Sequence, residues 1–299
     1  MRRLVRTLCA LALLAAGAAA AACAEVAAHN ARAKAEAGDL AGAQADLERA
    51  REQRPDSVET RIALGQVYYQ IARDALDRQH DEGRYLTFLE LSVSEFVKAI
   101  ELDPRNDEPH FYLAMMDAYR GDLHRALRGM NNARRLNPGG VAYTNIAELF
   151  VYMGQLEKAR TWNNLGLRRG APYDIGVFND MLIAWKQGDL DEARRCFADL
   201  RSANSEALRT INVARLPEAP RRFEDFARYC CGSPACGPYM RDACHALELD
   251  VRDRELSKEA LLKELRIEME RQRRLREVYE QRKELDIDVE GPPAEDAPR

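Results

Sequence analysis

Residues 121–126 read Gly-Asp-Leu-His-Arg-Ala, and the pattern within this stretch decides the fold. A glycine, an Asp or Gln and a Leu, with an alanine five residues after the glycine, return at residues 154–159, 188–193 and 38–43. The glycines at 121, 154 and 188 are 33 and 34 residues apart. Glycine ends one helix, and a small alanine lets the next helix approach closely. A repeat of this length predicts stacked two-helix units that bury their apolar faces against one another.

Further positions complete the repeat. Residues 64–68 read Leu-Gly-Gln-Val-Tyr, and the first three units end at Pro55, Pro104 and Pro138. The chain therefore resembles the tetratricopeptide repeat family, whose pattern is Leu-Gly-x-x-Tyr, then Ala-x-x-x-Phe, then Pro. The resemblance implies an all-α solenoid of about five helical hairpins. The residues after the repeats predict a disulfide-bonded C-terminal cap and a long C-terminal helix.

Spacing and composition divide the chain. The second repeat is 15 residues longer than the others, which predicts about two extra turns on each helix and a protruding hairpin. That hairpin is either a contact point or a tolerated insertion. We expect a signal peptide at 1–22, repeats at 23–57, 58–106, 107–139, 140–173 and 174–207, capping helices with a cysteine cluster at 208–252, a long charged helix at 253–285, and an acidic disordered tail at 286–299.

The N-terminal residues are typical of an export signal. Three arginines at 2, 3 and 6 precede an apolar run at 8–22 that is rich in Ala and Leu. The run ends Ala-Ala-Ala-Cys23, which resembles the lipobox of bacterial lipoproteins, where the cysteine receives diacylglycerol and becomes the first mature residue. In that family Ala24, in place of Asp, implies the outer membrane. We therefore expect a lipid anchor on the periplasmic face; a soluble periplasmic protein is the alternative.

Composition limits the possible functions. The formal charge is −4, and removal of residues 1–22, which carry three arginines and no acids, makes it −7. Such a balance gives no attraction to phosphate backbones, so we expect no nucleic-acid partner. The sequence contains no His-Glu-x-x-His, Gly-x-Ser-x-Gly, P-loop or dinucleotide glycine motif. We expect no enzyme, no catalytic residues, no cofactor, no metal and no small-molecule substrate.

The first helix of each repeat is expected to line a concave groove. Aromatic and amphipathic residues of the kind enriched at protein-binding hot spots fall there, so an apolar helix or extended segment of an envelope protein is the expected ligand. Alternatively, these side chains pack between helices or are covered by the C-terminal region, including the last helix. The predicted groove residues are Ile62, Tyr69, Phe111, Met115, Tyr119, Tyr152, Phe178, Leu182 and Trp185.

Four cysteines cluster after the repeats, at Cys230, Cys231, Cys236 and Cys244. Export into an oxidising compartment favours two disulfides. Because a bond between adjacent cysteines is strained, either Cys230–Cys236 with Cys231–Cys244 or Cys230–Cys244 with Cys231–Cys236 is expected. Bound zinc is the alternative, although the paired spacing typical of zinc sites is missing. We interpret Cys196 as a buried small apolar residue.

The last helix, near 257–285, has a narrow apolar stripe and a basic patch. The patch would meet acidic lipid headgroups or an acidic partner, or it is a solvated face. The stripe consists of Leu261, Leu262, Leu265, Met269, Leu275 and Tyr279. The patch consists of Arg271, Arg273, Arg274 and Arg276.

Two functional hypotheses follow. The first is a lipid-anchored scaffold that binds envelope proteins and helps to assemble or anchor a multiprotein machine. It resembles the tetratricopeptide lipoproteins that serve pilus secretins, gliding motility or outer-membrane protein insertion. The second is an exported thiol or zinc module in which the cluster from Cys230 to Cys244 is the active element.

Overall fold

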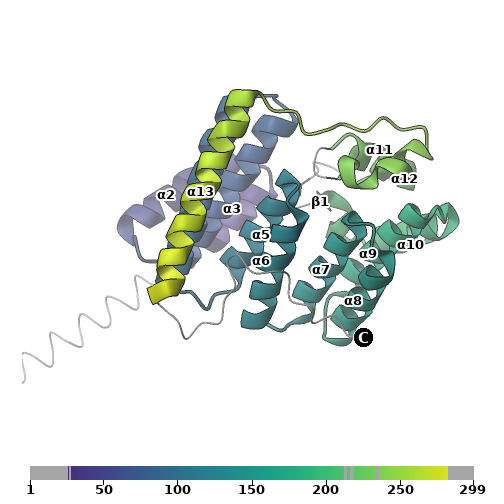
Figure 1. Cartoon of the computed structure of the whole chain (residues 1–299), viewed down its shortest axis with the longest axis horizontal. Coiled ribbons are helices and arrows are strands. Elements are labelled where there is room, and N and C mark those ends of the chain that lie inside the picture. Colours follow the sequence, from purple (N-terminus) through teal and green to yellow (C-terminus); the bar gives the residue numbers. More distant parts are fainter. Residues whose placement is uncertain (1–25, 27, 212–213, 216–218, 234–235, 282–299) are drawn as a thin grey trace, which may run out of the picture.

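The structure is a computed structural model that describes residues 26, 28–211, 214–215, 219–233 and 236–281 (Figure 1). Antiparallel helical hairpins follow one another along the chain, which confirms the all-α repeat fold. The first hairpin pairs the helical residues 28–36 with α2 (Leu40–Gln53). The next helices are α3 (Val58–Asp77), α4 (Glu82–Leu102), α5 (Glu108–Arg120), α6 (Leu123–Leu136), α7 (Gly140–Tyr152), α8 (Leu156–Arg168), α9 (Tyr173–Gln187) and α10 (Leu190–Ser202).

The repeated Gly-Asp-Leu motif joins the two helices of a hairpin. Gly121 ends α5 in the left-handed region, with φ +95°, where a side chain would be strained. The carboxylate of Asp122 then accepts a hydrogen bond from the backbone N–H of Arg125 and caps α6. Ala126 is completely buried at the contact between the two helices. In the last hairpin the same roles fall to Gly188, Asp189 and Ala193.

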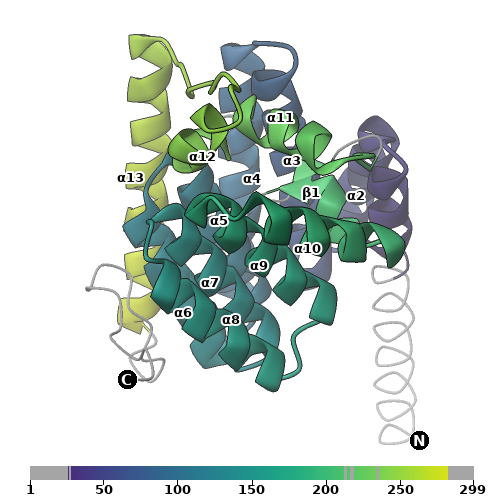
Figure 2. The ribbon, with the colours of Figure 1, turned by 90° about the vertical axis from the view of Figure 1, so that its right-hand side faces the viewer.

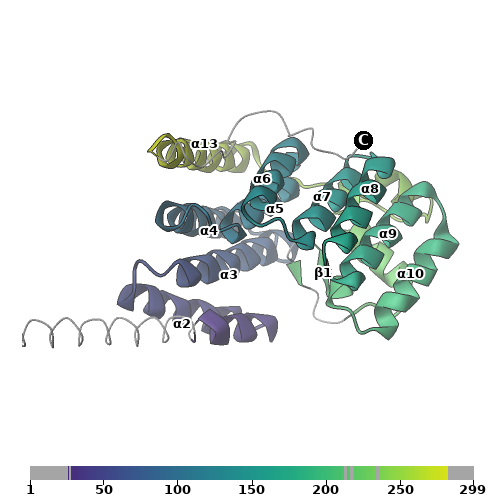
Figure 3. The same ribbon diagram turned by 90° about the horizontal axis from the view of Figure 1, so that it is seen from below.

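The second hairpin is long because it supports the C-terminal helix. Its helices α3 and α4 have 20 and 21 residues. The last helix, α13 (Lys258–Gln281), packs against α4 and extends the row formed by α2, α3 and α4 (Figure 3). The length was therefore predicted correctly, whereas the protruding hairpin was wrong. The extra turns are covered by residues from the end of the same chain.

A cap follows the repeats. It begins with the short helix η1 (Glu206–Arg209) and a two-stranded ladder in which β1 (Thr210–Ile211) pairs antiparallel with β2 (Ala214–Arg215). The expectation of capping helices at 208–252 was wrong for the ladder, and the chain returns to α-helix only at Phe223, after two prolines that lack a backbone donor. The helices α11 (Phe223–Cys231), η2 (Gly237–Met240) and α12 (Arg241–His245) complete the cap, with α11 against α10 and α12 against α9 (Figure 2).

Two disulfides hold the cap together. They join Cys230 to Cys236 and Cys231 to Cys244, which is one of the two pairings that the sequence allowed. The first links α11 to the residue before η2, and the second links α11 to α12. Cys196 is unpaired and buried on α10, as expected.

Parts of the sequence prediction lie outside the described residues. These are the signal peptide at 1–22, the proposed lipid attachment residue Cys23 and the acidic tail at 286–299. Among the helices within the described ranges, none combines the length and the apolar character needed to cross a membrane.

Candidate interaction surface

The residues predicted to line an open groove are mostly packed inside the chain. Trp185 and Tyr119 are each 1% exposed, and Tyr152 is 7% exposed. Phe111 is half-buried. The open groove expected from the sequence is therefore wrong, because side chains from the C-terminal cap and from neighbouring helices cover this face. The other predicted groove residues, Ile62, Tyr69, Met115, Phe178 and Leu182, are also buried.

Trp185 is the centre of the contact between the repeats and the cap. Its ring lies edge-to-face against Phe223, with ring centroids 5.5 Å apart, and also contacts Phe226. The indole N–H donates to the carbonyl of Ala243, 3.2 Å away. Phe178 meets Phe226 at right angles. A buried Trp is stable where its N–H has such a partner, so this residue belongs to the core and not to a wet groove.

A second contact closes the face one repeat earlier. Tyr152 stacks on Tyr239 of η2, with ring centroids 4.9 Å apart. The Tyr239 hydroxyl donates to the carbonyl of Ala118. The ammonium of Lys186 donates to the carbonyls of Val151 and Tyr239, and burial lowers the pKa of Lys186 to about 8. Backbone carbonyls of the repeats and of the cap thus share the ammonium of one partly buried lysine.

The third contact is internal to the repeats. Tyr119 donates its hydroxyl to a carboxylate oxygen of Asp77, at 2.7 Å, and the guanidinium of Arg73 lies 4.1 Å from the centroid of its ring. Arg73 also forms an ion pair with Asp77. Tyr69 meets Tyr119 edge-to-face. The hydroxyl of Tyr119, the guanidinium of Arg73 and the carboxylate of Asp77 are all paired with one another, so the cluster holds α3 against α5.

The cysteine cluster does not offer thiols. The sulfurs of Cys230, Cys231, Cys236 and Cys244 are all in disulfides, and each residue is at most 1% exposed. A zinc ligand must be a free thiolate. In the described ranges, no three side chains of His, Cys, Asp or Glu are grouped so that they could hold a metal ion. The geometry therefore gives the cluster a structural role.

The face of α13 that contacts the repeats is charged. Arg271 and Asp117 form an ion pair of 2.8 Å, with side chains 3% and 4% exposed. Glu268 accepts hydrogen bonds from Arg120, at 2.7 Å, and from Arg125. Burial works to raise the pKa of Glu268, but Arg271 and Arg120 hold it below its ordinary value. The carboxylate therefore stays charged within this network.

The charged contact continues toward the start of α13. Glu264 accepts hydrogen bonds from the hydroxyl of Tyr85 and from the guanidinium of Arg254, and its side chain is 6% exposed. Near the other end, Arg274 forms an ion pair of 2.7 Å with Glu101. Ion pairs thus run along the contact from the first turns of α13 to its last turns.

This geometry corrects the predicted basic patch on α13. Arg271 and Arg274 point toward the repeats and are paired there. Arg273 is exposed, but it forms ion pairs with Glu270 and Glu277 of its own helix. Arg276 is exposed. The four arginines do not share one face, so they form no continuous patch for lipid headgroups.

The outward face of α13 is apolar over its first half. Leu261 and Leu262 are each 49% exposed, Leu265 is 53% exposed and Met269 is 64% exposed. Leu261, Leu265 and Met269 are spaced four residues apart and therefore lie along one face. We call these four residues the outer stripe. Leu275, which the sequence placed with them, is buried.

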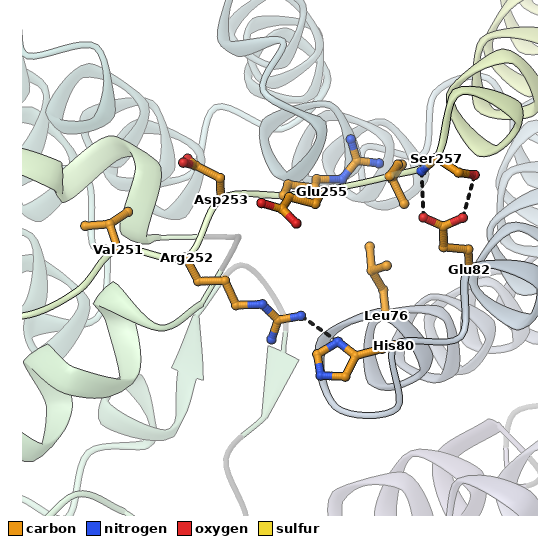
Figure 4. Close-up of a pocket in the computed structure, with 10 residues that line it drawn as sticks. Leu76, His80, Glu82, Val251, Arg252, Asp253, Glu255 and Ser257 are labelled. Atoms are coloured by element: carbon orange, nitrogen blue, oxygen red, sulfur yellow. Dashed lines mark hydrogen bonds between the residues drawn. The ribbon is translucent and has the colours of Figure 1, made fainter.

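A cavity of about 720 Å³ lies between the tip of the second hairpin and the segment 251–257 that leads into α13 (Figure 4). The guanidinium of Arg252 donates to Nδ1 of His80 and to the carbonyl of Asp77, each at 2.9 Å. Across the opening, Glu82 accepts hydrogen bonds from the backbone N–H and the hydroxyl of Ser257. The polar side chains therefore fasten the segment to the hairpin.

The C-terminal half of α13 is fixed by His110. The hydroxyl of Tyr279 donates to Nδ1 of His110 at 3.3 Å, and Nε2 contacts the carbonyl of Pro104 at 3.4 Å. The two rings are stacked. Burial lowers the pKa of His110 to about 4, since the charged ring would lose its hydration. The residue is therefore a neutral structural histidine at pH 7.

We expect His110 to make the fold sensitive to acid. The imidazole of His110 takes up a proton near pH 6.5 in the unfolded chain and near pH 4 in the folded chain. The free energy of unfolding therefore falls as the pH drops between those values. The loss is about 3 kcal/mol, measurable by urea unfolding at pH 7, 5.5 and 4.5. Replacing His110 with Gln should reduce the number of protons taken up on unfolding in this pH range by about one, and so flatten the pH dependence of stability. Replacing the exposed His245 with Gln should not. Identical slopes for wild type and His110→Gln would contradict this assignment.

The residues that hold α13 were missed in the sequence because the pairs are distant along the chain. Arg271 and Asp117 are 154 residues apart, and Arg254 and Tyr85 are 169 apart. One signal was present: Glu264 and Glu268 fall on the same helical face as Ile267 and Arg271. Acids on the face of a buried isoleucine indicate a charged contact.

Comparisons with known proteins add little to this geometry. No protein-family model matches the chain, and no curated protein matches it. Among solved structures, the chain is similar to PilF of Pseudomonas aeruginosa, with 18% sequence identity over 60% of this chain and 91% of that one. The TM-score is 0.34. The assignment of helical hairpins therefore depends on the geometry of this chain itself.

Proposed function

We propose that this protein is a non-enzymatic scaffold that binds other proteins in the bacterial envelope. A lipid on Cys23 anchors it to the periplasmic face of the outer membrane, where it helps to assemble or anchor a multiprotein machine. The export signal and the small-residue sequence before Cys23 support the location. Stacked hairpins, which usually supply surfaces, support the binding role.

The outer stripe on α13 is the observation that carries the binding role. Its four residues make up half of the large apolar residues that are exposed within the described ranges. The others, Val26, Leu91, Val141 and Tyr173, lie on separate elements. Scattered apolar residues are normal on a surface, but a contiguous row marks a contact site. The proposed binding surface is therefore the outer face of α13, and not the concave groove.

The buried titratable groups support a non-enzymatic role. His110 contacts Tyr279, Lys186 contacts backbone carbonyls, and Asp117 pairs with Arg271. Perturbed pKa values are typical of active sites, but ion-pair networks and burial produce them as well. Each shift here is explained by a contact that holds two helices or a helix and the cap together.

A photocrosslinking amino acid at Leu265 tests the binding role. In the native envelope, the full chain carrying it should form an adduct with another protein, because Leu265 is the centre of the outer stripe. The matched control places the crosslinker at Tyr173, which is 74% exposed but lies on α9, far along the chain from α13. Protein adducts at Tyr173 and none at Leu265 would contradict the proposed function.

We expect Cys23→Ser to release the protein from the membrane. The thioether bond to the lipid cannot form on serine. Among the described residues, no helix is long and apolar enough to hold the protein in the membrane in place of the lipid. Membrane fractionation and intact mass should show a soluble protein that lacks a lipid-sized increment. A wild-type protein that is already soluble, with a free thiol at Cys23, would refute the anchor.

A further inference from the structure

The first half of α13 leaves four large apolar side chains exposed and buries two acids beside Ala260 and Ile267. Glu264, Glu268 and Arg271 face the repeats, while the leucines and the methionine of the outer stripe face outward. A helix that docks on a protein normally buries its apolar side. The elements that end a helical stack normally present a polar outer face. The outer stripe departs from both expectations, so it is placed where a further element can cover it.

We infer that the outer stripe receives an amphipathic helix of a partner protein, and that this partner helix carries acidic residues beside its apolar stripe. The inference rests on the proposed function and names the class of partner. The helical form and the position of the partner segment follow from the fold. The helices α2, α3, α4 and α13 form a row, and the next helix of that row would lie on the outer side of α13 (Figure 3).

The length of the outer stripe fits a helix. From Leu261 to Met269 it covers nine residues, and the first and last are about 12 Å apart at a rise of 1.5 Å per residue. This span matches anchors at i, i+3 or i+4, and i+7 of a partner helix in the helix-in-groove mode. The partner therefore needs about two turns of apolar residues.

The charge beside the outer stripe selects an acidic partner. Among the exposed charged residues from 258 to 273 there are four cations and two acids. Glu270 is paired with Arg273, and Glu259 lies four residues before Lys263. Lys258 and Arg266, each within one turn of Leu262, are the remaining cations. Complementary charge directs binding and excludes partners of like charge.

The same charges argue against a second copy of this chain. In a two-fold contact the same surface meets itself, so an antiparallel pairing centred on Leu265 would bring Arg266 next to its own copy. A stable dimer also buries roughly 800 Å² on each partner, and four half-exposed side chains supply at most about half of that area. A partner helix with acidic margins avoids the contact between like charges.

Two designed peptides test the inference on the full mature chain. Both are 21-residue helices with one leucine stripe; one has Glu and the other has Lys at the margins. We expect the Glu peptide to bind at least about tenfold more tightly at low salt, with the difference shrinking as salt screens the charges. Arg266→Glu with Lys258→Glu should reverse the preference, whereas Arg228→Glu, an exposed cation of the cap, should not. Leu265→Asp should abolish binding of both peptides.

Several results would overturn the inference. These are equal affinity for the two peptides, binding that survives Leu265→Asp, or a stronger interaction with vesicles of anionic phosphatidylglycerol than with the Glu peptide. A crosslink from position 265 to a second copy, or to residues 282–299 of the same chain, would also overturn it. The outcomes separate the two proposals: a protein adduct at position 265 together with a preference for the Lys peptide would retain the scaffold function and refute only the acidic helix.

Discussion

Replacing Trp185 with alanine is expected to lower the free energy of unfolding by about 3–5 kcal/mol. The indole is 1% exposed, lies between Phe223 and Phe226, and donates to the carbonyl of Ala243. Its removal leaves a cavity where the cap meets the repeats and strands that carbonyl without its donor. Urea unfolding followed by circular dichroism measures the change.

Two variants control for this prediction. Trp185→Phe keeps an aromatic ring but lacks the N–H, so it should lie between wild type and Trp185→Ala. Tyr173→Ala removes a ring that is 74% exposed, and should change stability by less than about 0.5 kcal/mol. If Trp185→Ala were as stable as Tyr173→Ala, the indole would lie in an open groove, and the closed face described above would be wrong.

Replacing Arg271 with methionine is expected to cost about 3–5 kcal/mol, because it leaves a buried charge without its partner. Asp117, whose side chain is 4% exposed, would lose the guanidinium that lies 2.8 Å away. Glu268 would lose one of the arginines with which it pairs. Burial already works to raise the pKa of Asp117 and Arg271 opposes that rise, so the variant should take up a proton at a higher pH. Chemical denaturation at several pH values measures both effects.

The double variant Arg271→Met with Asp117→Leu should recover most of the lost stability, since an apolar pair of similar volume often replaces a buried ion pair without loss. Arg273→Met is the matched control on the same helix. Arg273 pairs with Glu270 and Glu277 at the surface, and its loss should have no measurable effect. Equal effects of Arg271→Met and Arg273→Met would show that the ion network does not hold α13.

The repeats could be predicted because their signal is local and periodic. Gly121, Asp122 and Ala126 lie within six residues, and each acts on its own hairpin as a helix end, a helix cap and a close contact. The same roles at Gly188, Asp189 and Ala193 repeat the signal. Structure that depends on neighbours in sequence is therefore readable from sequence.

The disulfide pairing was predictable only in part. Adjacency excluded a bond between Cys230 and Cys231, but both remaining pairings close short loops of similar size. The choice depends on how α11 and α12 face one another, and α12 is only five residues long. Nothing in the local sequence specifies that angle.

The groove was misread because a helical period identifies a face but not what covers it. Tyr152 and Trp185 do lie on the helices that face the concave side, yet Tyr239 and Phe223 from the cap cover them. Similarly, the apolar stripe of α13 was predicted from the sequence, but the pairing of Glu268 with arginines of α5 and α6 was not. Contacts over more than 100 residues have no sequence period.

Hydroxyl-radical footprinting of the full chain, read by mass spectrometry, tests the central claim most directly. If the concave face is closed and the outer stripe is open, Met269 at 64% exposure and Leu265 at 53% should be oxidised rapidly, as Tyr173 is at 74%. Trp185, Tyr152 and Tyr119 should be protected, despite the high intrinsic reactivity of aromatic rings. Labelling of Trp185 and Tyr152 as fast as Tyr173, with Met269 protected, would contradict the account.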